Sequence, residues 1–239
     1  MIIRTMGEKI IFGSHNSMSY LPIKNKWLSP FGWVAKCQNK SLVEQIDAGA
    51  EILDFRIALD KDSRWKFRHG VIKYDMSEEH ERYRNIIDYD SASHIMDNYE
   101  SYNIYDDDII YCLDLIRKKY PNKHLYIRII LEKTRKGKEN VDKIEFELLC
   151  CQLEERYKGH FTFLGGNYKP NWEKLYNFKD TIDYESSFSQ WVSSMQPNAF
   201  ILTRICPWIY AKLYNMKNRK KKQSEFNTYD FIDKELLLK

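Results

Sequence analysis

Two histidines, an aspartate and an arginine stand at or near the ends of apolar runs in the first third of the sequence. His15 follows the run KIIFGS and precedes Asn16, His69 lies in WKFRHG, and Asp54 and Arg56 lie between them in EILDFRI. Histidine titrates near neutrality, so two imidazoles can serve as base and acid at one pH, and a guanidinium matches phosphate oxygens. These residue types fit phosphodiester cleavage by an internal hydroxyl, in which one imidazole takes a proton and the other protonates the leaving oxygen.

The spacing of Asp54 and Arg56 places both side chains on one face of a strand, with the apolar residues between and around them on the other face. A carboxylate and a guanidinium are a costly way to fill a barrel interior, which favours a site at the carboxyl end of a barrel strand. An internal ion pair that fixes the strand register is an open alternative and does not exclude catalysis. His15 and His69 can likewise be structural histidines.

The elements that must position these residues alternate between short apolar runs and longer helical patterns, which predicts βα units and a mostly parallel sheet. We expect strands at 9–14, 51–57, 65–70, 124–132, 161–166, 199–205 and 228–233. We expect helices at 41–49, 106–122 and 139–159, and a helix with a long loop within 74–103. Seven strands suit a closed barrel, and no linker divides the chain, so we expect one α/β domain over residues 1–239.

Composition limits the partners and the compartment. The 239 residues are 43% hydrophobic, and 38 Lys and Arg against 34 Asp and Glu give a formal charge of +4, too small to indicate a nucleic-acid partner. The five cysteines form no CxxC pair, so neither a disulfide framework nor a zinc site is indicated, and reduced thiols are expected. We see no signal peptide and no apolar run of about 20 residues for a transmembrane segment. These features predict a cytoplasmic or peripheral membrane protein.

The motifs GSHNSMSY, EQIDAGAEILDFRI and RHG, in this order, resemble the X-domain of phosphatidylinositol-specific phospholipases C, in particular its small bacterial members. The resemblance implies a distorted TIM-like (β/α) barrel that cleaves phosphatidylinositol to diacylglycerol and inositol 1,2-cyclic phosphate. By position it makes His15 the general base and His69 the general acid. Arg56 matches the arginine that bacterial members place where the animal enzymes hold calcium, and Asp54 matches the acidic residue two positions earlier.

The sequence departs from the bacterial pattern in ways that leave the metal question open. Asn16 stands where bacterial members usually have Asp, and Glu132 matches a calcium ligand of the calcium-using relatives. Asn16, Asp54 and Glu132 could therefore hold calcium, but the fixed charge of Arg56 would compete for the same place. We favour catalysis without a cofactor, keep calcium as the alternative, and expect Asn16, Arg128 and Glu132 to contact the substrate.

The last predicted strand resembles the closing strand of the family, and Asp230 could support His15 by holding its tautomer. Asp180 and Asp233 are alternatives for this role.

The expected partner is an inositol phospholipid at a membrane surface, and the sequence leaves the oligomeric state open. The basic run at 217–222 could attract anionic headgroups or be a solvated loop, and the loop at 29–33 could enter a lipid interface or pack against the protein.

A rival hypothesis is a catalytically weak homologue that binds inositol phospholipid or a soluble inositol phosphate. A metal-dependent glycerophosphodiesterase ranks lower, because its His-Arg-Gly and Glu-x-Asp motifs are replaced here by Gly-Ser-His-Asn and Asp-x-Arg.

Overall fold

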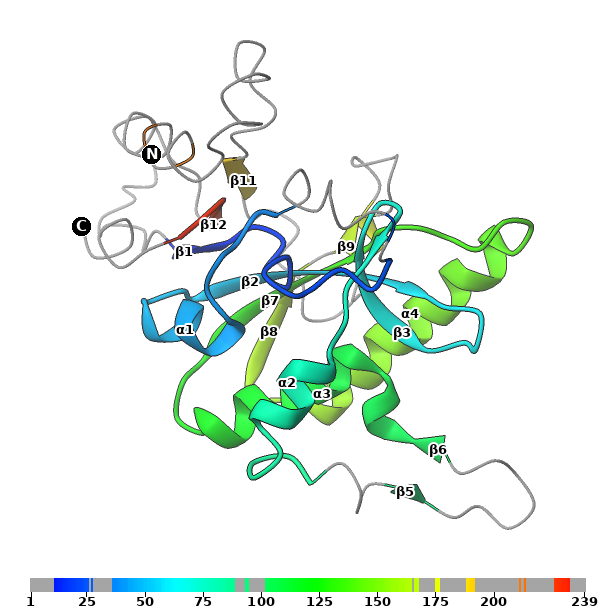
Figure 1. The fold of residues 1–239 in the computed structure, drawn as a ribbon, viewed down its shortest axis with the longest axis horizontal. Coiled ribbons are helices and arrows are strands. Elements are labelled where there is room, and N and C mark those ends of the chain that lie inside the picture. Colours follow the sequence, from blue (N-terminus) through cyan, green and yellow to red (C-terminus); the bar gives the residue numbers. More distant parts are fainter. Residues whose placement is uncertain are drawn as a thin grey trace, which may run out of the picture.

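The computed structural model describes a mixed α/β fold (Figure 1) over most of the chain's first two thirds and over shorter segments beyond it. The described residues are 11–25, 27, 36–88, 93–94, 102–164, 166–167, 175–176, 188–191, 211, 213 and 226–232. The strands are β1 (Ile11–Ser14), β2 (Ile52–Leu59), β3 (Trp65–His69), β4 (Ile72–Lys73), β5 (Ser93–His94), β6 (Tyr102–Asn103), β7 (Leu125–Leu131), β8 (Phe161–Leu164), β9 (Gly166–Asn167), β10 (Leu175–Tyr176), β11 (Phe188–Trp191) and β12 (Phe226–Tyr229). The helices are α1 (Leu42–Asp47), α2 (Ser77–Arg82), α3 (Asp108–Lys119) and α4 (Glu139–Arg156), with a short 3-10 helix at Ile104–Asp106.

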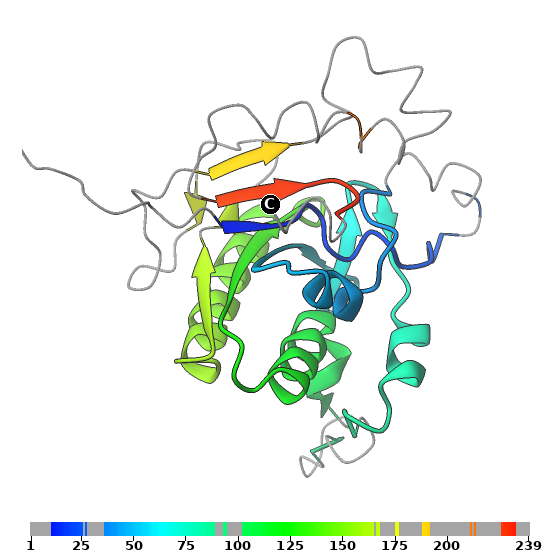
Figure 2. The same ribbon diagram turned by 90° about the vertical axis from the view of Figure 1, so that its left-hand side faces the viewer.

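The main sheet is parallel along β11, β12, β1, β2, β7 and β8, and an antiparallel hairpin of β3 and β4 joins it at β2. β3 pairs antiparallel with β2 and with β4. Figure 2 shows β11, β12 and β1 side by side above the helices, where the sheet curls as part of a barrel. The prediction of a mostly parallel sheet is therefore confirmed, with the β2–β3–β4 hairpin as an antiparallel part that the apolar runs did not reveal.

One edge of β2 is shared by two strands. β1 pairs with its beginning, where Gly13 faces Ile52, and β3 pairs with its end at residues 57–59. A Cβ on Gly13 would lie 1.8 Å from the Ile52 carbonyl oxygen, so only glycine permits this close approach. Residues 54–56 of β2 lie between the two pairings, next to the end of β1. The candidate active site lies at this position.

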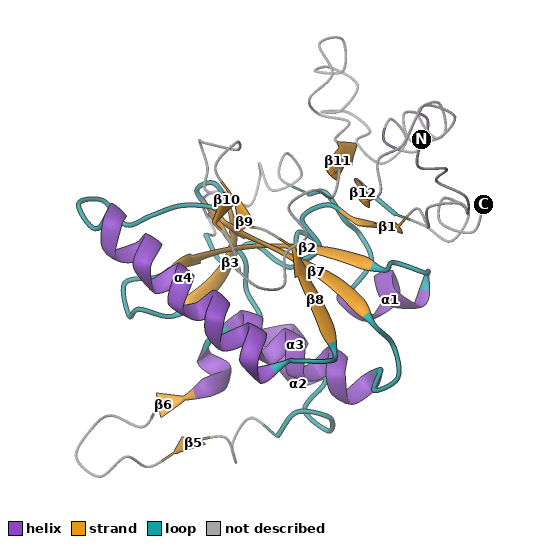
Figure 3. Ribbon diagram, turned by 180° about the vertical axis from the view of Figure 1, so that it is seen from behind, coloured by secondary structure: helices purple, strands orange, loops and turns teal. Residues whose placement is uncertain are grey.

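Helices cover the apolar face of the sheet (Figure 3). Phe55 and Ile57 of β2 belong to one buried cluster with residues of α1, α3 and α4, and Trp65 of β3 makes an edge contact with Phe146 of α4. Asp54 and Arg56 point to the other face, so the predicted division of β2 into an apolar and a charged face is confirmed. The helix layer thus leaves the charged face of β2 for the site.

Local sequence signals explain where α1 begins and ends. Ser41 caps the helix: its Oγ accepts from the Glu44 amide, and the Glu44 carboxylate accepts from the Ser41 amide, which completes a capping box. Gly49, at φ 110°, follows the last turn in a conformation that favours glycine. The predicted helix at 41–49 is confirmed.

The acidic residues at the start of α3 bond to the neighbouring strand β3. Asp107 at the N-cap position makes no side-chain capping bond, and its carboxylate instead accepts from the Trp65 amide at 2.7 Å. Asp108 accepts from the Phe67 amide at 3.1 Å and from Lys66 Nζ at 2.9 Å. These acids therefore satisfy the edge of β3, in addition to lying at the positive end of the helix dipole.

The predicted helices at 106–122 and 139–159 correspond to α3 and α4, and α2 is the short helix within 74–103. The strand predicted at 199–205, the basic run at 217–222 and the loop at 29–33 lie outside the described residues. Within the described part of the chain, no helix is both long and apolar enough to cross a membrane.

Candidate active site

Strand β2 supplies the charged centre of the site. Asp54 and Arg56 project from one face, and Asp54 is the register partner of Arg128 on the adjacent strand β7. The Arg56 Nε donates to Asp54 Oδ2 at 3.2 Å, and Arg128 Nη1 lies 3.4 Å from Asp54 Oδ1. All three side chains are buried, so each charge depends on its partners rather than on water.

His15 and Asn16 begin the loop that follows β1. The His15 amide still pairs with the Tyr229 carbonyl of β12 at 3.0 Å, so the histidine continues the strand pairing by one residue. Asn16 then turns the chain with φ 44°, a conformation that asparagine tolerates well. Its backbone N–H donates to Asp54 Oδ2 at 2.9 Å. The loop is thereby anchored to the carboxylate of β2.

Asp230 lies directly after β12, beside the end of β1. The buried amide of Gln38 ties the two strand ends together: its Nε2 donates to the His15 and Tyr229 carbonyl oxygens at 2.9 and 2.8 Å. Gln38 Oε1 accepts from the Ile232 amide at 3.1 Å. Asp230 is therefore held on both sides, through Tyr229 and through Ile232.

These elements bring Asp230, His15 and Arg56 into a chain of buried hydrogen bonds. Asp230 Oδ1 lies 2.6 Å from His15 Nδ1, and Arg56 Nη2 lies 2.7 Å from His15 Nε2. A guanidinium can only donate, so His15 Nε2 accepts, and the proton of the neutral ring sits on Nδ1, directed to Asp230. This is the tautomer in which a histidine can take a proton at Nε2.

The guanidinium of Arg56 also connects two carboxylates of the site, those of Asp54 and Glu132. Its Nη1 lies 3.6 Å from Glu132 Oε2, at the end of β7. Burial lowers the pKa of Arg56, but Asp54 and Glu132 outweigh this effect and raise the pKa above its usual value. Burial raises the pKa of Asp54, yet Arg56 and Arg128 hold that pKa below its usual range. Burial lowers the pKa of Arg128 to about 10, so Arg128 is still charged at neutral pH.

His69 closes β3 at the margin of this group. Its link to the group runs through the next residue, because the Gly70 amide donates to Glu132 Oε1 at 2.7 Å, and Glu132 in turn lies beside Arg56. His69 is half-buried, as expected for a residue at the mouth of a site. The structure thus brings His15, Asn16, Asp54, Arg56, Arg128, Glu132 and Asp230 into one contact network, with His69 at its edge.

The donor set does not fit a calcium ion. Calcium would need the carboxylate oxygens of Asp54 and Glu132, which are the oxygens that Arg56 and Arg128 contact. The Asn16 side-chain nitrogen Nδ2, which cannot bind calcium, lies 3.5 Å from Tyr74 Oη and 4.0 Å from Cys37 Sγ. The buried guanidinium groups of Arg56 and Arg128 thus supply the positive charge beside these carboxylates that a calcium ion would supply.

Sequence reasoning missed three residues that shape the site: Gln38, Cys37 and Tyr74. Gln38 and Cys37 belong to a segment without strand or helix pattern, and Tyr74 follows β4 and accepts from Asn16. Burial raises the pKa of Cys37 well above its usual value, and the Asp230 carboxylate adds to this rise. The thiol of Cys37 is therefore protonated at neutral pH. A glutamine four residues before a helix gives no signal from which its place beside His15 could be predicted.

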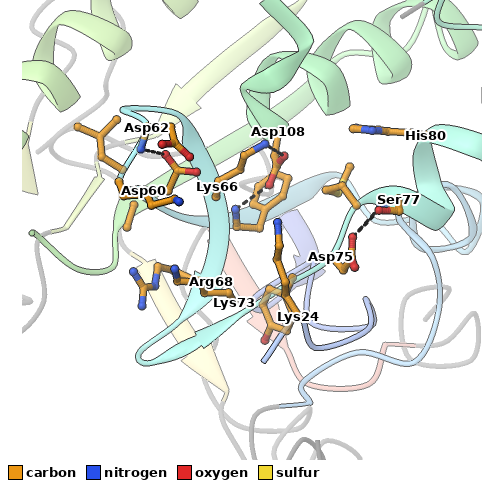
Figure 4. A pocket seen from close by; sticks show the side chains of 16 residues that line it. Lys24, Asp60, Asp62, Lys66, Arg68, Lys73, Asp75, Ser77, His80 and Asp108 are labelled. Carbon is orange, nitrogen blue, oxygen red and sulfur yellow. Dashed lines mark hydrogen bonds and ion pairs between the residues drawn. The ribbon is translucent and has the colours of Figure 1, made fainter. Parts of the chain in front are cut away.

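A cavity of about 260 Å³ lies beside the site, between the β2–β3–β4 hairpin and the start of α2 (Figure 4). Tyr74 lines it and also contacts Asn16, so it borders the site without containing the His15 group. Its lining is charged with both signs, and Lys66 Nζ pairs with Asp108 Oδ1 at 2.9 Å. The lining residues that Figure 4 labels are Lys24, Asp60, Asp62, Lys66, Arg68, Lys73, Asp75, Ser77, His80 and Asp108.

Comparison with known proteins supports the fold. No protein-family model matches the sequence, and no curated protein matches it. Among solved structures, the chain is similar to the phosphatidylinositol-specific phospholipase C from Listeria monocytogenes, with a TM-score of 0.50 and 14% sequence identity, over 98% of this chain and 94% of that chain. The likeness confirms the predicted fold class: this chain has a distorted TIM-like α/β barrel fold, of the kind found in that phospholipase C.

Proposed function

We propose that this protein is a phosphoric diester lyase that cleaves phosphatidylinositol, or a related inositol phospholipid, to diacylglycerol and inositol 1,2-cyclic phosphate. The observation that carries the proposal is the buried chain from Asp230 through His15 to Arg56. It joins a carboxylate, an oriented imidazole and a phosphate-binding cation, which are the groups that attack by an internal hydroxyl requires.

In the first part of the reaction, His15 Nε2 takes the proton of the inositol 2-hydroxyl while the hydroxyl oxygen attacks phosphorus. Asp230 holds the Nδ1 proton and stabilises the imidazolium that forms. Arg56 contacts Nε2 in the absence of substrate, so it must release the imidazole when the phosphate enters. The same movement places the guanidinium against the phosphate oxygens as their charge develops.

In the second part, the bond from phosphorus to the diacylglycerol oxygen breaks, and this oxygen needs a proton. His69 supplies it from the edge of the site. Glu132 accepts the Gly70 amide and so fixes the end of β3 that carries His69. Arg128 stays against Asp54 and contributes positive charge to phosphate binding. Neither part of this mechanism requires a metal ion.

The substrate is an amphiphile, so we propose that the protein works at a membrane surface as a peripheral protein. Trp27 supports this view, because the residue is 74% exposed and follows the first site motif in the sequence. Exposed tryptophans favour the interface between lipid and water.

The deciding experiment is phosphorus NMR of the protein with phosphatidylinositol micelles, with calcium or with chelator, for the wild type and for His15→Ala and His69→Ala. We expect a cyclic phosphate signal that persists in chelator and is lost in both variants. His124→Ala is the matched control, because His124 bonds Thr162 on β8 rather than the site. A signal that depends on calcium would contradict the metal-independent mechanism. No turnover by folded protein would contradict the lyase assignment for this substrate.

Asn16 favours a second candidate function, a catalytically weak homologue that binds inositol phospholipid or inositol phosphate. An amide stands where bacterial members usually place a carboxylate, and an amide cannot assist the acid histidine by accepting or delivering its proton. Titration of the folded protein with a soluble inositol phosphate separates the candidates: binding without cyclic phosphate formation from phosphatidylinositol would support the binding role.

A further inference from the structure

We propose that His15, Cys37 and Asp230 form a zinc-binding site that takes His15 out of catalysis when it is occupied. One ligand atom from each residue lies within 4.8 Å of those from the other two, and all three residues are buried. Zinc binds histidine nitrogen, cysteine sulfur and carboxylate oxygen, often through three protein ligands and a water. The thiolate favours zinc over calcium and magnesium, which prefer oxygen ligands.

The backbone holds the three ligands in one frame. The Cys37 amide donates to Ser19 Oγ at 2.9 Å, in the loop that begins with His15. The Cys37 carbonyl accepts from the Phe231 amide at 2.7 Å, one residue after Asp230. The backbone of Cys37 is therefore hydrogen-bonded to the loop of His15 and to the loop of Asp230. These bonds hold the thiol close to the other two ligands.

The distances require only small movements. Zinc bonds of about 2.0 to 2.3 Å in tetrahedral geometry separate the ligand atoms by about 3.3 to 3.8 Å. The atoms of this cluster lie within 4.8 Å of one another, and His15 Nδ1 and Asp230 Oδ1 are 2.6 Å apart. Zinc entry therefore draws the more distant atoms together by about 1 Å and opens the His15–Asp230 hydrogen bond by a similar amount.

The charges of the cluster balance those of the ion. The Asp230 carboxylate and the Cys37 thiolate together carry two negative charges, which neutralise Zn²⁺ in a buried place where an uncompensated charge is costly. Arg56 contacts His15 at Nε2, on the opposite side of the ring from Nδ1, and it retains the carboxylates of Asp54 and Glu132 as partners. A metal bound at Nδ1 therefore avoids direct contact with the guanidinium.

Zinc displaces one proton from the Cys37 thiol and one from His15 Nδ1. Cys37 releases its thiol proton to water as the bond from sulfur to zinc forms. The Nδ1 proton of His15 is replaced by zinc and moves, through solvent, to Nε2, which leaves a neutral ring. Nε2 then carries a proton and faces the donor groups of Arg56, so the guanidinium must withdraw from the ring toward Asp54 and Glu132. In this state Nε2 cannot take a proton from a substrate hydroxyl. One proton is released for each zinc bound, and His15 can no longer act as a base.

Zinc should therefore inhibit the reaction, and this consequence rests on the proposed function, whereas zinc binding itself does not. The test uses Co²⁺ as a spectroscopic substitute for zinc, added to chelator-treated, reduced protein. We expect a near-ultraviolet charge-transfer band from sulfur to cobalt in the wild type, and its loss when Zn²⁺ displaces the cobalt. In Cys37→Ser the band should disappear, and affinity for zinc should fall by at least about 100-fold, the upper range for loss of an outer-shell partner.

Cys151→Ser is the matched control, because Cys151 is an exposed thiol on α4. Its band should equal that of the wild type. A band that survives in Cys37→Ser or is lost in Cys151→Ser would overturn the proposal, as would the absence of a band from folded wild type. A second measurement needs no variant: calorimetric titration of the wild type with zinc, in buffers of different ionisation enthalpy, should show one proton released for each zinc bound, and binding of zinc without proton release would contradict ligation by the Cys37 thiolate.

The two proposals fail separately. Cyclic phosphate formation without a cobalt band would leave the lyase and remove the zinc site. A cobalt band in a protein without turnover would leave the zinc site and remove the lyase.

Discussion

Asp230 Oδ1 and His15 Nδ1 lie 2.6 Å apart although 215 residues separate them in the sequence. The pairing of β12 with β1 brings them together, and the buried Gln38 fixes both strand ends. This contact is the geometry that the proposed role of Asp230, orientation of the imidazole, requires.

Replacing Asp230 with Asn should lower kcat by about 10²- to 10⁴-fold and change KM little, because the amide can present its NH₂ group to Nδ1 and favour the wrong tautomer. Steady-state kinetics of cyclic phosphate formation measure the effect. Asp233→Asn is the control, since the sequence left that residue open as an alternative. A large loss in Asp233→Asn with none in Asp230→Asn would contradict the assignment.

Replacing Arg56 with Met should reduce the free energy of unfolding by about 3–5 kcal/mol, because Asp54 and Glu132 lose a buried partner. Urea denaturation monitored by circular dichroism measures the change. Arg64→Met removes a partly exposed pair with Asp106, whose atoms are 3.8 Å apart, and should cost about 0–1 kcal/mol. Equal losses in the two variants would show that Arg56 does not hold the carboxylates.

Replacing Gly13 with Ala should destabilise the protein by about 1–3 kcal/mol or more, because the new Cβ meets the Ile52 carbonyl oxygen at 1.8 Å and β1 is held between two strands. Thermal unfolding measures the loss. Gly137→Ala is the comparison: a Cβ there meets nothing within 4 Å, and only its φ of 75° opposes alanine, at a cost of about 1–2 kcal/mol. A Gly13→Ala protein as stable as the wild type would contradict the close approach of β1 to β2.

Stability should also depend on Asp108. Burial raises the pKa of this carboxyl to about 6, and the nearby Lys66 ammonium only partly opposes the rise. A folded-state pKa above that of the unfolded chain means that the folded protein binds more protons between about pH 4 and 6, so this contribution to stability is present below pH 4 and is lost as pH rises through 6. The loss is of the order of 3 kcal/mol.

The measurement compares urea denaturation of the wild type and Asp108→Asn from pH 4 to pH 7. The free energy of unfolding of the wild type, relative to that of the variant, should decrease as the pH rises from about 4 to 6 and should level off toward pH 7. Asp62→Asn, at an exposed position, should show no such trend relative to the wild type. A constant difference for Asp108→Asn would contradict the raised pKa.

The parts of the fold that depend on neighbouring residues could be predicted from the sequence. Period-two alternation was sufficient to divide β2 into apolar and charged faces. The helix expected at 41–49 was likewise found, with a Ser41–Glu44 capping box at its start. The antiparallel β3 could not be distinguished from a parallel strand, because the apolar content of a short run does not record the direction of its partner.

The parts of the site that depend on distant loops could not be predicted with the same detail. The sequence offered Asp230, Asp180 and Asp233 for one role. Asp180 and Asp233 lie outside the described residues, and the place of Asp230 beside His15 depends on the register of β12 against β1. The position of Cys37 beside His15 follows from backbone hydrogen bonds of two loops to one irregular segment, which leave no periodic pattern. Cysteine spacing likewise suggested no zinc site, because the proposed ligands are 22 and 193 positions apart.

The shared edge of β2 has a consequence for how the site meets its ligand. Beyond the end of β1, Ser17 hydrogen-bonds the same edge of β2. Its backbone N–H donates to the Asp54 carbonyl oxygen at 2.8 Å, and its Oγ accepts from the Asp54 backbone N–H at 2.9 Å. The loop that carries His15 is thus a continuation of the sheet rather than a mobile lid, and it cannot open without breaking buried bonds of the barrel. Most of the entropy lost in fixing His15 is therefore lost when the chain folds, and a headgroup meets a histidine whose backbone is already ordered.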